Sequence, residues 1–272
     1  MKAAVFHGPH QPLTIEEVDI DKPMGREVLV RVVASGVCHS DLHFIEGLYP
    51  FAAPAILGHE AAGIVEAVGP HVDEFKPGDH VIACLSVFCG HCSYCLTGRT
   101  HLCQSRPVRA ANEPPKLSWK GAPVNQFANL SAYAEKMLVH ENALVKIDDT
   151  MPLDRAALIG CGVTTGVGAV LNTARIEAGS TVAVFGAGGV GLAAITDREC
   201  VAPARYDAQG AHETIASAPS RLAASMIVSA GSPQHVCTRP LPPECVAWSL
   251  LLSLALLETR RLMSSASAGA SA

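Results

Sequence analysis

The sequence predicts an α/β protein, with a mainly β domain over residues 1–150 followed by the beginning of a parallel, doubly wound unit over residues 151–199. Three observations lead to this prediction: short β-branched runs in the first part, a strand that leads directly into a glycine-rich turn in the second, and a change of composition near residue 200. We expect residues 200–272 to form an atypical, partly disordered tail.

Three runs in the first domain have the composition of β-strands. They are EVLVRVVAS (27–35), AAGIVEAVG (61–69) and DHVIAC (79–84), and turns with Gly and Pro, such as KPGD (76–79), bound them. Because short strands separated by such turns are typical of antiparallel sheets, we expect a mainly antiparallel domain.

The composition changes after Pro152. The segment LDRAALIGCGVTTGVGAVLNTA (153–174) is predicted to be helical, and its small residues allow close packing. TVAVF (181–185) then predicts a strand.

The turn after this strand carries a G-x-G-x-x-G motif, formed by Gly186, Gly188 and Gly191. Gly186 permits the tight turn, Gly188 the close approach of a pyrophosphate, and Gly191 the packing of the helix on the strand. With Gly189 in the same turn, the motif predicts the first strand, turn and helix of a Rossmann dinucleotide-binding unit.

The residues after this helix do not continue the unit. A second strand should end in an acidic residue about 20 positions on, but ECVAPARYDAQGAHE (199–213) has no apolar run before Asp207. Residues 200–272 contain no Lys and three of the chain's 23 Gly, and only SMIVSAG (225–231) has the composition of a strand. We therefore expect the chain to leave the Rossmann pattern near Ile195, through a change of reading frame, a truncated gene or a misplaced gene end.

Composition excludes several classes of function. The 272 residues are 49% hydrophobic and 17% charged, which indicates a globular chain, and a net charge of −5 gives no support for a nucleic-acid partner. The longest apolar run, 246–257, is too short to span a bilayer, so we do not expect the chain to interact with a membrane. The N-terminus lacks the apolar region of a signal peptide, so ten cysteines point to metal ligands in a cytoplasmic protein rather than to disulfides.

The clearest metal signal is CGHCSYCLTGRTHLC, which spaces four cysteines as C-x2-C-x2-C-x7-C. Four thiolates on one short lobe can surround a tetrahedral Zn²⁺ with no open position, which defines a structural site. The predicted ligands are Cys89, Cys92, Cys95 and Cys103.

A second set is dispersed: Cys38 in GVCHSDLH, His59 in GHEAAG and Cys161 in IGCGVTTG. A Cys2His set leaves the fourth zinc position for water or substrate, as a catalytic zinc requires. Spacing alone leaves the alternative open that these are core cysteines and a structural histidine.

GHEAAGIVEAVGPHV fits the pattern G-H-E-x2-G-x5-G-x2-V, and the chain thereby resembles the zinc-containing medium-chain alcohol dehydrogenase family. The four-cysteine lobe, CGVTTG and GAGGVG follow in that family's order, so the resemblance extends to about Ala194. It implies a GroES-like catalytic domain with a structural zinc lobe at about 84–104, followed by a Rossmann domain.

The resemblance also implies roles for residues of the first domain. Cys38, His59 and Cys161 would be catalytic zinc ligands, and Glu60 the acid beside them that approaches the metal during ligand exchange. Asp41 would hydrogen-bond the imidazole of His59 and fix its tautomer.

The relay and cofactor residues are implied in the same way. Ser40 and His43 would carry the alcohol proton from the zinc-bound alkoxide to solvent, and His39 would face the cofactor pyrophosphate. Thr165 would lie against the nicotinamide ring.

The activity implied is hydride transfer between a primary alcohol or aldehyde and NAD(H), with two Zn²⁺ per chain. The choice between NAD and NADP stays open, as does a glutathione-adduct formaldehyde dehydrogenase. The alternative of a different class is a truncated, catalytically impaired GroES-like protein that binds zinc. Members of the family form homo-oligomers largely through the Rossmann sheet. Because we expect that sheet to be incomplete here, the resemblance leaves it open whether this chain forms a homo-oligomer.

Overall fold

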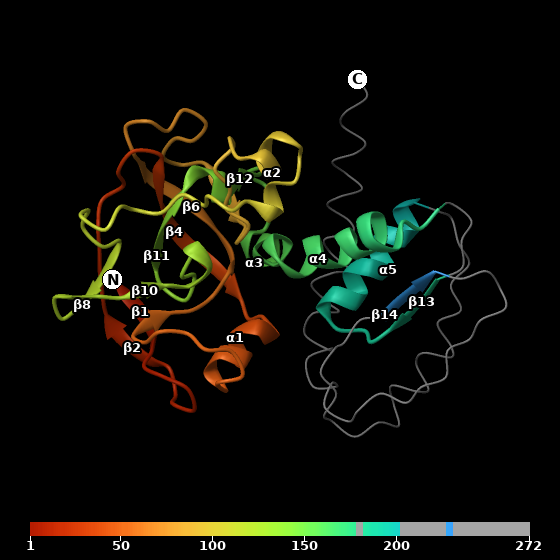
Figure 1. Ribbon diagram of the computed structural model, residues 1–272, viewed down its shortest axis with the longest axis horizontal. Helices are drawn as coiled ribbons and strands as arrows, with labels where there is room; N and C mark the ends of the chain where they lie inside the picture. The colour runs from red at the N-terminus through yellow and green to blue at the C-terminus, as the bar shows by residue number, and fades with distance from the viewer. Residues whose placement is uncertain (178–181, 202–226, 231–272) are drawn as a thin grey trace. The chain divides into compact units, whose positions relative to one another are not determined.

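The computed structural model describes residues 1–177, 182–201 and 227–230, and the other residues of the expected tail lie outside the described residues. Internal contacts divide the chain into two compact units, Met1–Cys161 and Gly162–Ala272. Figure 1 shows the helices and strands of both units.

The first unit is built on a five-stranded antiparallel sheet with the order β11-β4-β6-β7-β12. Its strands are β4 (Glu27–Gly36), β6 (Glu60–Val68), β7 (His80–Ala83), β11 (Lys136–His140) and β12 (Leu144–Lys146). The three strands predicted from β-branched runs are therefore confirmed as β4, β6 and β7. The register between β4 and β6 shifts between Leu29 and Val30 and again between Val32 and Ala34, as β-bulges do where a sheet bends.

Alternation along β4 explains the main core of this unit. Val28 and Val30 are fully buried, whereas Arg31 between the strand's inward positions is exposed. The buried valines join side chains of the neighbouring strands in one cluster, which includes Val65, Val81, Met137 and Val139.

Two smaller sheets complete the β structure of the first unit. One has four strands in the order β10-β5-β1-β2, and the other has three in the order β3-β8-β9. Their strands are β1 (Lys2–Phe6), β2 (Thr14–Glu17), β3 (Asp19–Ile20), β5 (Ala55–Ile56), β8 (Leu117–Trp119), β9 (Ala122–Pro123) and β10 (Asn125–Gln126).

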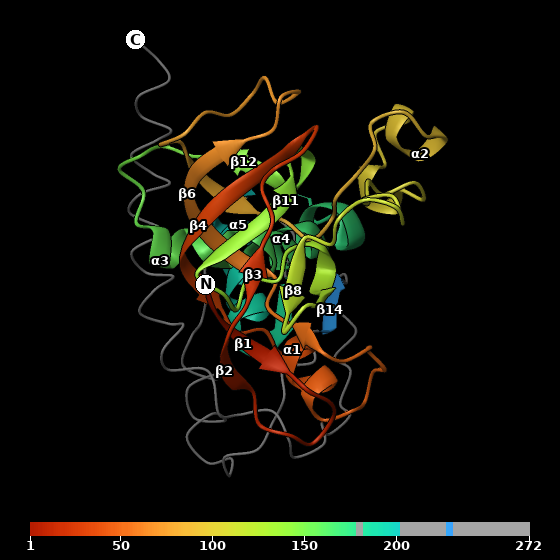
Figure 2. The same cartoon turned by 90° about the vertical axis from the view of Figure 1, so that its left-hand side faces the viewer.

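Short helices lie at the connections. They are α1 (His39–Ile45), α2 (Ser93–Leu96), α3 (Leu153–Ala156) and the 3₁₀ helices Thr100–Leu102, Phe127–Asn129, Glu141–Ala143 and Ala157–Gly160. Figure 2 shows the loop that carries α2 extending from the body of the first unit. The segment predicted as helical, 153–174, is broken at Cys161, which is the last residue of this unit.

The second unit contains α4 (Gly162–Gly168), the π-helical turn Ala169–Ala174, β13 (Val182–Phe185), α5 (Gly189–Val201) and β14 (Ile227–Ala230). Gly166 on α4 allows the close approach of α5, because any side chain at this position would overlap the carbonyl of Val190. The close packing predicted from small residues is thus confirmed in α4.

β13 and β14 pair antiparallel, with Val182 opposite Ala230 and Phe185 opposite Ile227. The strand predicted within 225–231 is therefore present, but it does not run parallel to β13 as successive strands of a doubly wound sheet do.

Within the described ranges, no single helix is long and apolar enough to cross a membrane. One bent pair of helices, Leu153–Gly160 with Gly162–Ala174, reaches that length and apolar character when the two are taken together.

Candidate metal centres

The four cysteines of the lobe converge as predicted. The ligand atoms of Cys89, Cys92, Cys95 and Cys103 all lie within 4.8 Å of one another, and all four are free thiols. Sγ of Cys92 is 3.5 Å from Sγ of Cys95 and 3.9 Å from Sγ of Cys103. Zinc–sulfur bonds of about 2.3 Å in a tetrahedron place sulfur atoms about 3.8 Å apart, so the residues present fit Zn²⁺.

The backbone of the lobe also directs its polar groups at sulfur. The N–H of Cys92 donates to Sγ of Cys89, and the N–H of Cys89 donates to Sγ of Cys103, each at 3.3 Å. Gly90 and Gly98 adopt positive φ angles of 83° and 74°, which allow the tight turns around the cluster. The backbone N–H of Cys95 holds the pKa of the Cys92 thiol down at about 6, while partial burial raises that of Cys95 to about 11. A cation is what would allow all four to ionise together.

The dispersed set converges as well. Ligand atoms of Cys38, His59, Glu60 and Cys161 lie within 4.8 Å of one another, with His59 and Glu60 buried. They come from three separate places in the first unit: the residue before α1, the start of β6, and the break after the 3₁₀ helix Ala157–Gly160.

Two glycines make room for this convergence. A side chain at Gly36 would overlap the carboxylate of Glu60, and one at Gly160 would overlap the carbonyl of Ala83 on β7. Gly160 therefore lets the chain bring Cys161 up against the sheet, while Gly36 leaves space for Glu60.

The two thiols of this group shift each other's pKa. The neighbouring thiol of Cys161 lowers the pKa of Cys38 to about 4, against the effect of burial, and the same contact raises the pKa of Cys161. Burial and the negative charge of Cys38 raise the pKa of Glu60 to about 7. Several anionic groups thus compete for one small volume, which is the environment that a divalent cation stabilises.

His59 is oriented by Asp41. Its Nδ1 lies 3.2 Å from Oδ1 of Asp41, a carboxylate that is 1% exposed. Burial disfavours the charged imidazole, but the hydrogen bonds with Asp41 and Cys38 outweigh it and raise the pKa of His59 to about 10. Since Nδ1 is engaged with Asp41, Nε2 is left for a metal, and the Cys2His donor set fits zinc with one open position.

A residue that no sequence motif indicated also contacts Asp41. The hydroxyl of Tyr133 donates to Oδ2 of Asp41 at 3.0 Å, and burial, together with the charge of Asp41, raises the pKa of that hydroxyl. The two residues are 92 positions apart, so nothing in the sequence around either one links them.

The residues predicted for the proton relay lie on α1. The side chain of Ser40 lies beside the sulfur of Cys38. His43 follows one turn later, and its ring lies 4.8 Å from that of His39 and 5.4 Å from that of Tyr49, between ring centroids. Ser40 and His39 are exposed and His43 is half-buried. The relay itself remains a prediction.

The residues predicted to bind a cofactor lie in the second unit, apart from His39. Gly186 follows β13 with a φ of 96°, and Gly188 and Gly189 lead into α5. A side chain at Gly191 would overlap the carbonyl of Gly186, so this glycine is required for the helix to pack on the turn. Thr165 is exposed on α4.

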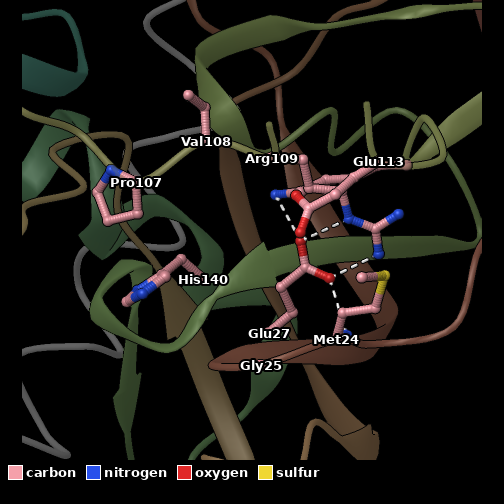
Figure 3. A pocket seen from close by; sticks show the side chains of 9 residues that line it. Met24, Gly25, Glu27, Pro107, Val108, Arg109, Glu113 and His140 are labelled. Carbon is pink, nitrogen blue, oxygen red and sulfur yellow. Dashed lines mark hydrogen bonds and ion pairs between the residues drawn. The ribbon is translucent and has the colours of Figure 1, made fainter. Parts of the chain in front are cut away.

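A small pocket in the first unit involves other residues. Its empty volume is about 510 Å³, and Met24, Glu27, Arg109, Lys116 and His140 are among the side chains that line it (Figure 3). Arg109 donates to both carboxylate oxygens of Glu27, at 2.9 and 2.6 Å, and to Asp21 at 2.6 Å. Arg109 and Lys116 both pair with Glu27, and none of the residues that line the pocket belongs to either metal group.

Comparison with known proteins places these features in a family. Residues 24–149 match the model of the alcohol dehydrogenase GroES-like domain. The chain is 45% identical over 201 residues to the class-3 alcohol dehydrogenase of Pisum sativum and 46% identical over 198 residues to that of Drosophila melanogaster. Each match covers 71% of this chain and, respectively, 53% and 52% of the relative. The chain thus spans about half the length of the curated relatives it matches.

Solved structures agree. An alcohol dehydrogenase zinc-binding domain protein from Burkholderia ambifaria superposes with a TM-score of 0.68 at 38% identity, over 74% of this chain and 56% of that one. The benzyl alcohol dehydrogenase of Acinetobacter calcoaceticus superposes with a TM-score of 0.66 at 35% identity, with the same coverage.

Proposed function

We propose, because the chain belongs to the zinc-containing medium-chain alcohol dehydrogenase family, that it transfers hydride between a primary alcohol or aldehyde and NAD(H) and binds two zinc ions. The convergence of Cys38, His59, Glu60 and Cys161 is the observation that carries this proposal. Of these, Cys38, His59 and Cys161 would ligate the ion, with Glu60 beside them. Such a Cys2His set leaves the fourth position to water or substrate, as in a catalytic rather than a structural zinc site.

Bound at this group, zinc would supply a Lewis acid that lowers the pKa of an alcohol hydroxyl. The protein's own part is to hold the ligands in place. Asp41 would fix the tautomer of His59, and Cys38 and Cys161 would hold the ion as thiolates, while Glu60 lies close enough to exchange with a ligand.

Proton transfer is assigned to α1. Bound NAD would supply a hydride acceptor for the alcohol carbon, and the hydroxyl of Ser40 would take up the O–H proton. His43 would pass this proton to solvent, because histidine exchanges protons readily near neutral pH. The place of Ser40 beside the sulfur of Cys38 supports this role.

Cofactor binding is assigned to the turn after β13. The backbone of Gly186, Gly188 and Gly189 and the first turn of α5 would bind the pyrophosphate of NAD, with Gly191 keeping the helix close to the turn. His39 would add a contact to the pyrophosphate, and Thr165 would lie against the nicotinamide.

One observation favours the second candidate function, a GroES-like protein that binds zinc without turnover. β13 pairs antiparallel with β14, whereas a dinucleotide domain of this family extends its sheet with parallel strands. In that case both metal groups would bind zinc but the nucleotide turn would not bind NAD.

Zinc content, NADH binding and NAD-linked oxidation of a primary alcohol, measured on the purified full chain, separate the two functions. We expect two zinc ions per chain and measurable turnover. Cys161→Ser should lose one zinc and all activity, while Cys84→Ser, which alters a free cysteine outside both groups, should keep both. Two zinc ions without NADH binding would establish the second function instead.

A further inference from the structure

Asp41 lies at the centre of a closed set of hydrogen bonds. Its Oδ1 accepts from the N–H of Gly58 at 3.1 Å and from Nδ1 of His59 at 3.2 Å. Its Oδ2 accepts from the N–H of Cys38 at 3.3 Å and from the hydroxyl of Tyr133 at 3.0 Å. A carboxylate offers about four acceptor positions, so these donors fill the capacity of Asp41.

Tyr133 differs from the other three donors in origin. Cys38, Gly58 and His59 belong to the segments that carry the ligands themselves, whereas Tyr133 comes from the chain just before β11. Its own backbone is held on both sides, because its N–H donates to the carbonyl of Leu57 at 3.0 Å and its carbonyl accepts from Ala4 at 2.8 Å. Tyr133 is thus a fixed point against which Asp41 can be oriented.

Gly58 is what allows the tyrosine ring to reach this position. It has a φ of 90°, and a Cβ atom on it would lie 2.5 Å from Cδ1 of Tyr133 and 2.8 Å from its backbone nitrogen. The glycine that precedes the histidine ligand therefore accommodates Tyr133 as well as the turn.

We propose that Tyr133 is a positioning residue for the metal site, holding Oδ2 of Asp41 so that Oδ1 fixes the imidazole of His59. The inference rests on the proposed function, since it takes Cys38, His59 and Cys161 as ligands of one metal ion. A carboxylate group is rigid, so a donor that holds one oxygen also sets the direction of the other. Without the hydroxyl, Oδ2 keeps only the 3.3 Å bond from the N–H of Cys38, so the orientation of Asp41, and through it that of Nε2 of His59, is less tightly fixed.

The test compares the full-length wild-type protein with Tyr133→Phe, which keeps the ring and removes only the hydroxyl. Tyr94→Phe is the matched control, because Tyr94 lies on the cysteine lobe. Co²⁺ is the probe: its thiolate charge-transfer and d–d absorption report ligand geometry, and Cys161→Ser identifies the bands of the dispersed group. Affinity is measured by competition with a chelator.

We expect Tyr133→Phe to bind Co²⁺ at the dispersed group about tenfold more weakly, at the lower end of the effect of outer hydrogen-bond partners, with altered d–d bands. Tyr94→Phe should match the wild-type protein at this group. Full occupancy of the cysteine lobe in each variant shows that the domain has folded.

A double-mutant cycle with Asp41→Asn separates a positioning role from a general structural one. If Tyr133 acts through Asp41, adding Tyr133→Phe to Asp41→Asn should change the affinity by less than about twofold. Wild-type affinity and spectrum in Tyr133→Phe, or the same tenfold loss in both backgrounds, would overturn the inference. A wild-type protein that binds Co²⁺ only at the cysteine lobe would overturn the proposed function and this inference with it. That outcome is measured on the wild-type protein alone, so it is distinct from the outcomes of the variants.

Discussion

Nδ1 of His59 and Oδ1 of Asp41 lie 3.2 Å apart, and both side chains are buried in the first unit. The two residues are 18 positions apart in the sequence. Asp41 lies on α1, which follows Cys38, and His59 precedes β6. The contact therefore couples α1 to the start of β6, and it determines which imidazole nitrogen faces the thiols.

Asp41→Asn is expected to weaken metal binding at the dispersed group by about 10- to 100-fold, because a neutral amide orients and polarises the imidazole less well than a carboxylate. Equilibrium titration with Zn²⁺ in the presence of a competing chelator measures this. Asp148→Asn, at an exposed carboxylate that bonds Thr150, should leave the affinity unchanged. An Asp41→Asn protein with wild-type affinity would show that His59 is oriented by other contacts.

Cys95→Ser is expected to remove one zinc ion per chain and to lower the midpoint of thermal unfolding, because a structural zinc contributes directly to folding free energy. Zinc analysis and scanning calorimetry measure the two effects. The control is Cys84→Ser, a cysteine that belongs to neither metal group. Equal zinc content in the two variants would contradict the assignment of the lobe.

Arg109→Met is expected to lower the free energy of unfolding by about 3 kcal/mol, because it leaves the carboxylate of Glu27 buried without its main partner (Figure 3). Urea denaturation measures the change. Arg31→Met is the matched control: Arg31 is half-exposed and lies 4.0 Å from Glu66, so less than about 1 kcal/mol is expected. If both variants lose similar amounts of unfolding free energy, the ion pair between Arg109 and Glu27 contributes no more than an exposed one.

The carboxylate of Glu27 should also make the stability of the protein depend on pH. Burial raises the pKa of its carboxyl, but Arg109, the N–H of Met24 and Lys116 outweigh burial and hold the pKa below its ordinary value of 4.5. A lowered folded-state pKa gives stability above the unfolded pKa and loses it as pH falls through the folded one. The unfolding free energy of the wild type relative to Glu27→Gln should therefore fall as pH drops below about 4.5. Because both proteins release metal at low pH, the effect of that release on stability cancels in the difference between them. A difference in unfolding free energy that does not change with pH would contradict the expectation.

Gly191→Ala is expected to abolish NADH binding, because the added methyl group overlaps the carbonyl of Gly186 and forces α5 away from the turn. Fluorescence titration with NADH measures binding. Gly168→Ala is the control, since a Cβ atom there meets only the amide of Asn172 at 3.8 Å. If both variants bind NADH like the wild type, the turn after β13 is not the cofactor site.

The convergence of the four lobe cysteines was predictable from their spacing alone. That of Cys38, His59 and Cys161 was predicted only through the resemblance to a family, because each of them taken singly could be a core residue. The strands β4, β6 and β7 were predictable, since β-branched runs between glycine- and proline-containing turns have few alternatives. The break of the predicted helix at Cys161 was not, because its neighbours have helical composition and only packing of Gly160 against β7 interrupts the helix there.

Long-range partners were beyond the sequence. The bond from Tyr133 to Asp41 and the bonds from Arg109 to Glu27 and Asp21 join residues more than 80 positions apart. The direction of β14 was equally hidden, because the composition of a strand does not specify whether its neighbour runs parallel or antiparallel.

The two metal groups differ in how far along the chain their members are spread, and this sets an order of assembly. Cys89 and Cys103 are 14 positions apart, so closing the lobe costs little chain entropy and needs no distant partner. Cys38, His59 and Cys161 meet only after β6 has paired with β4 and Gly160 has docked on β7. During refolding the lobe should therefore bind its ion first, and the dispersed group should become able to bind metal only when the long-range topology of the first unit is complete.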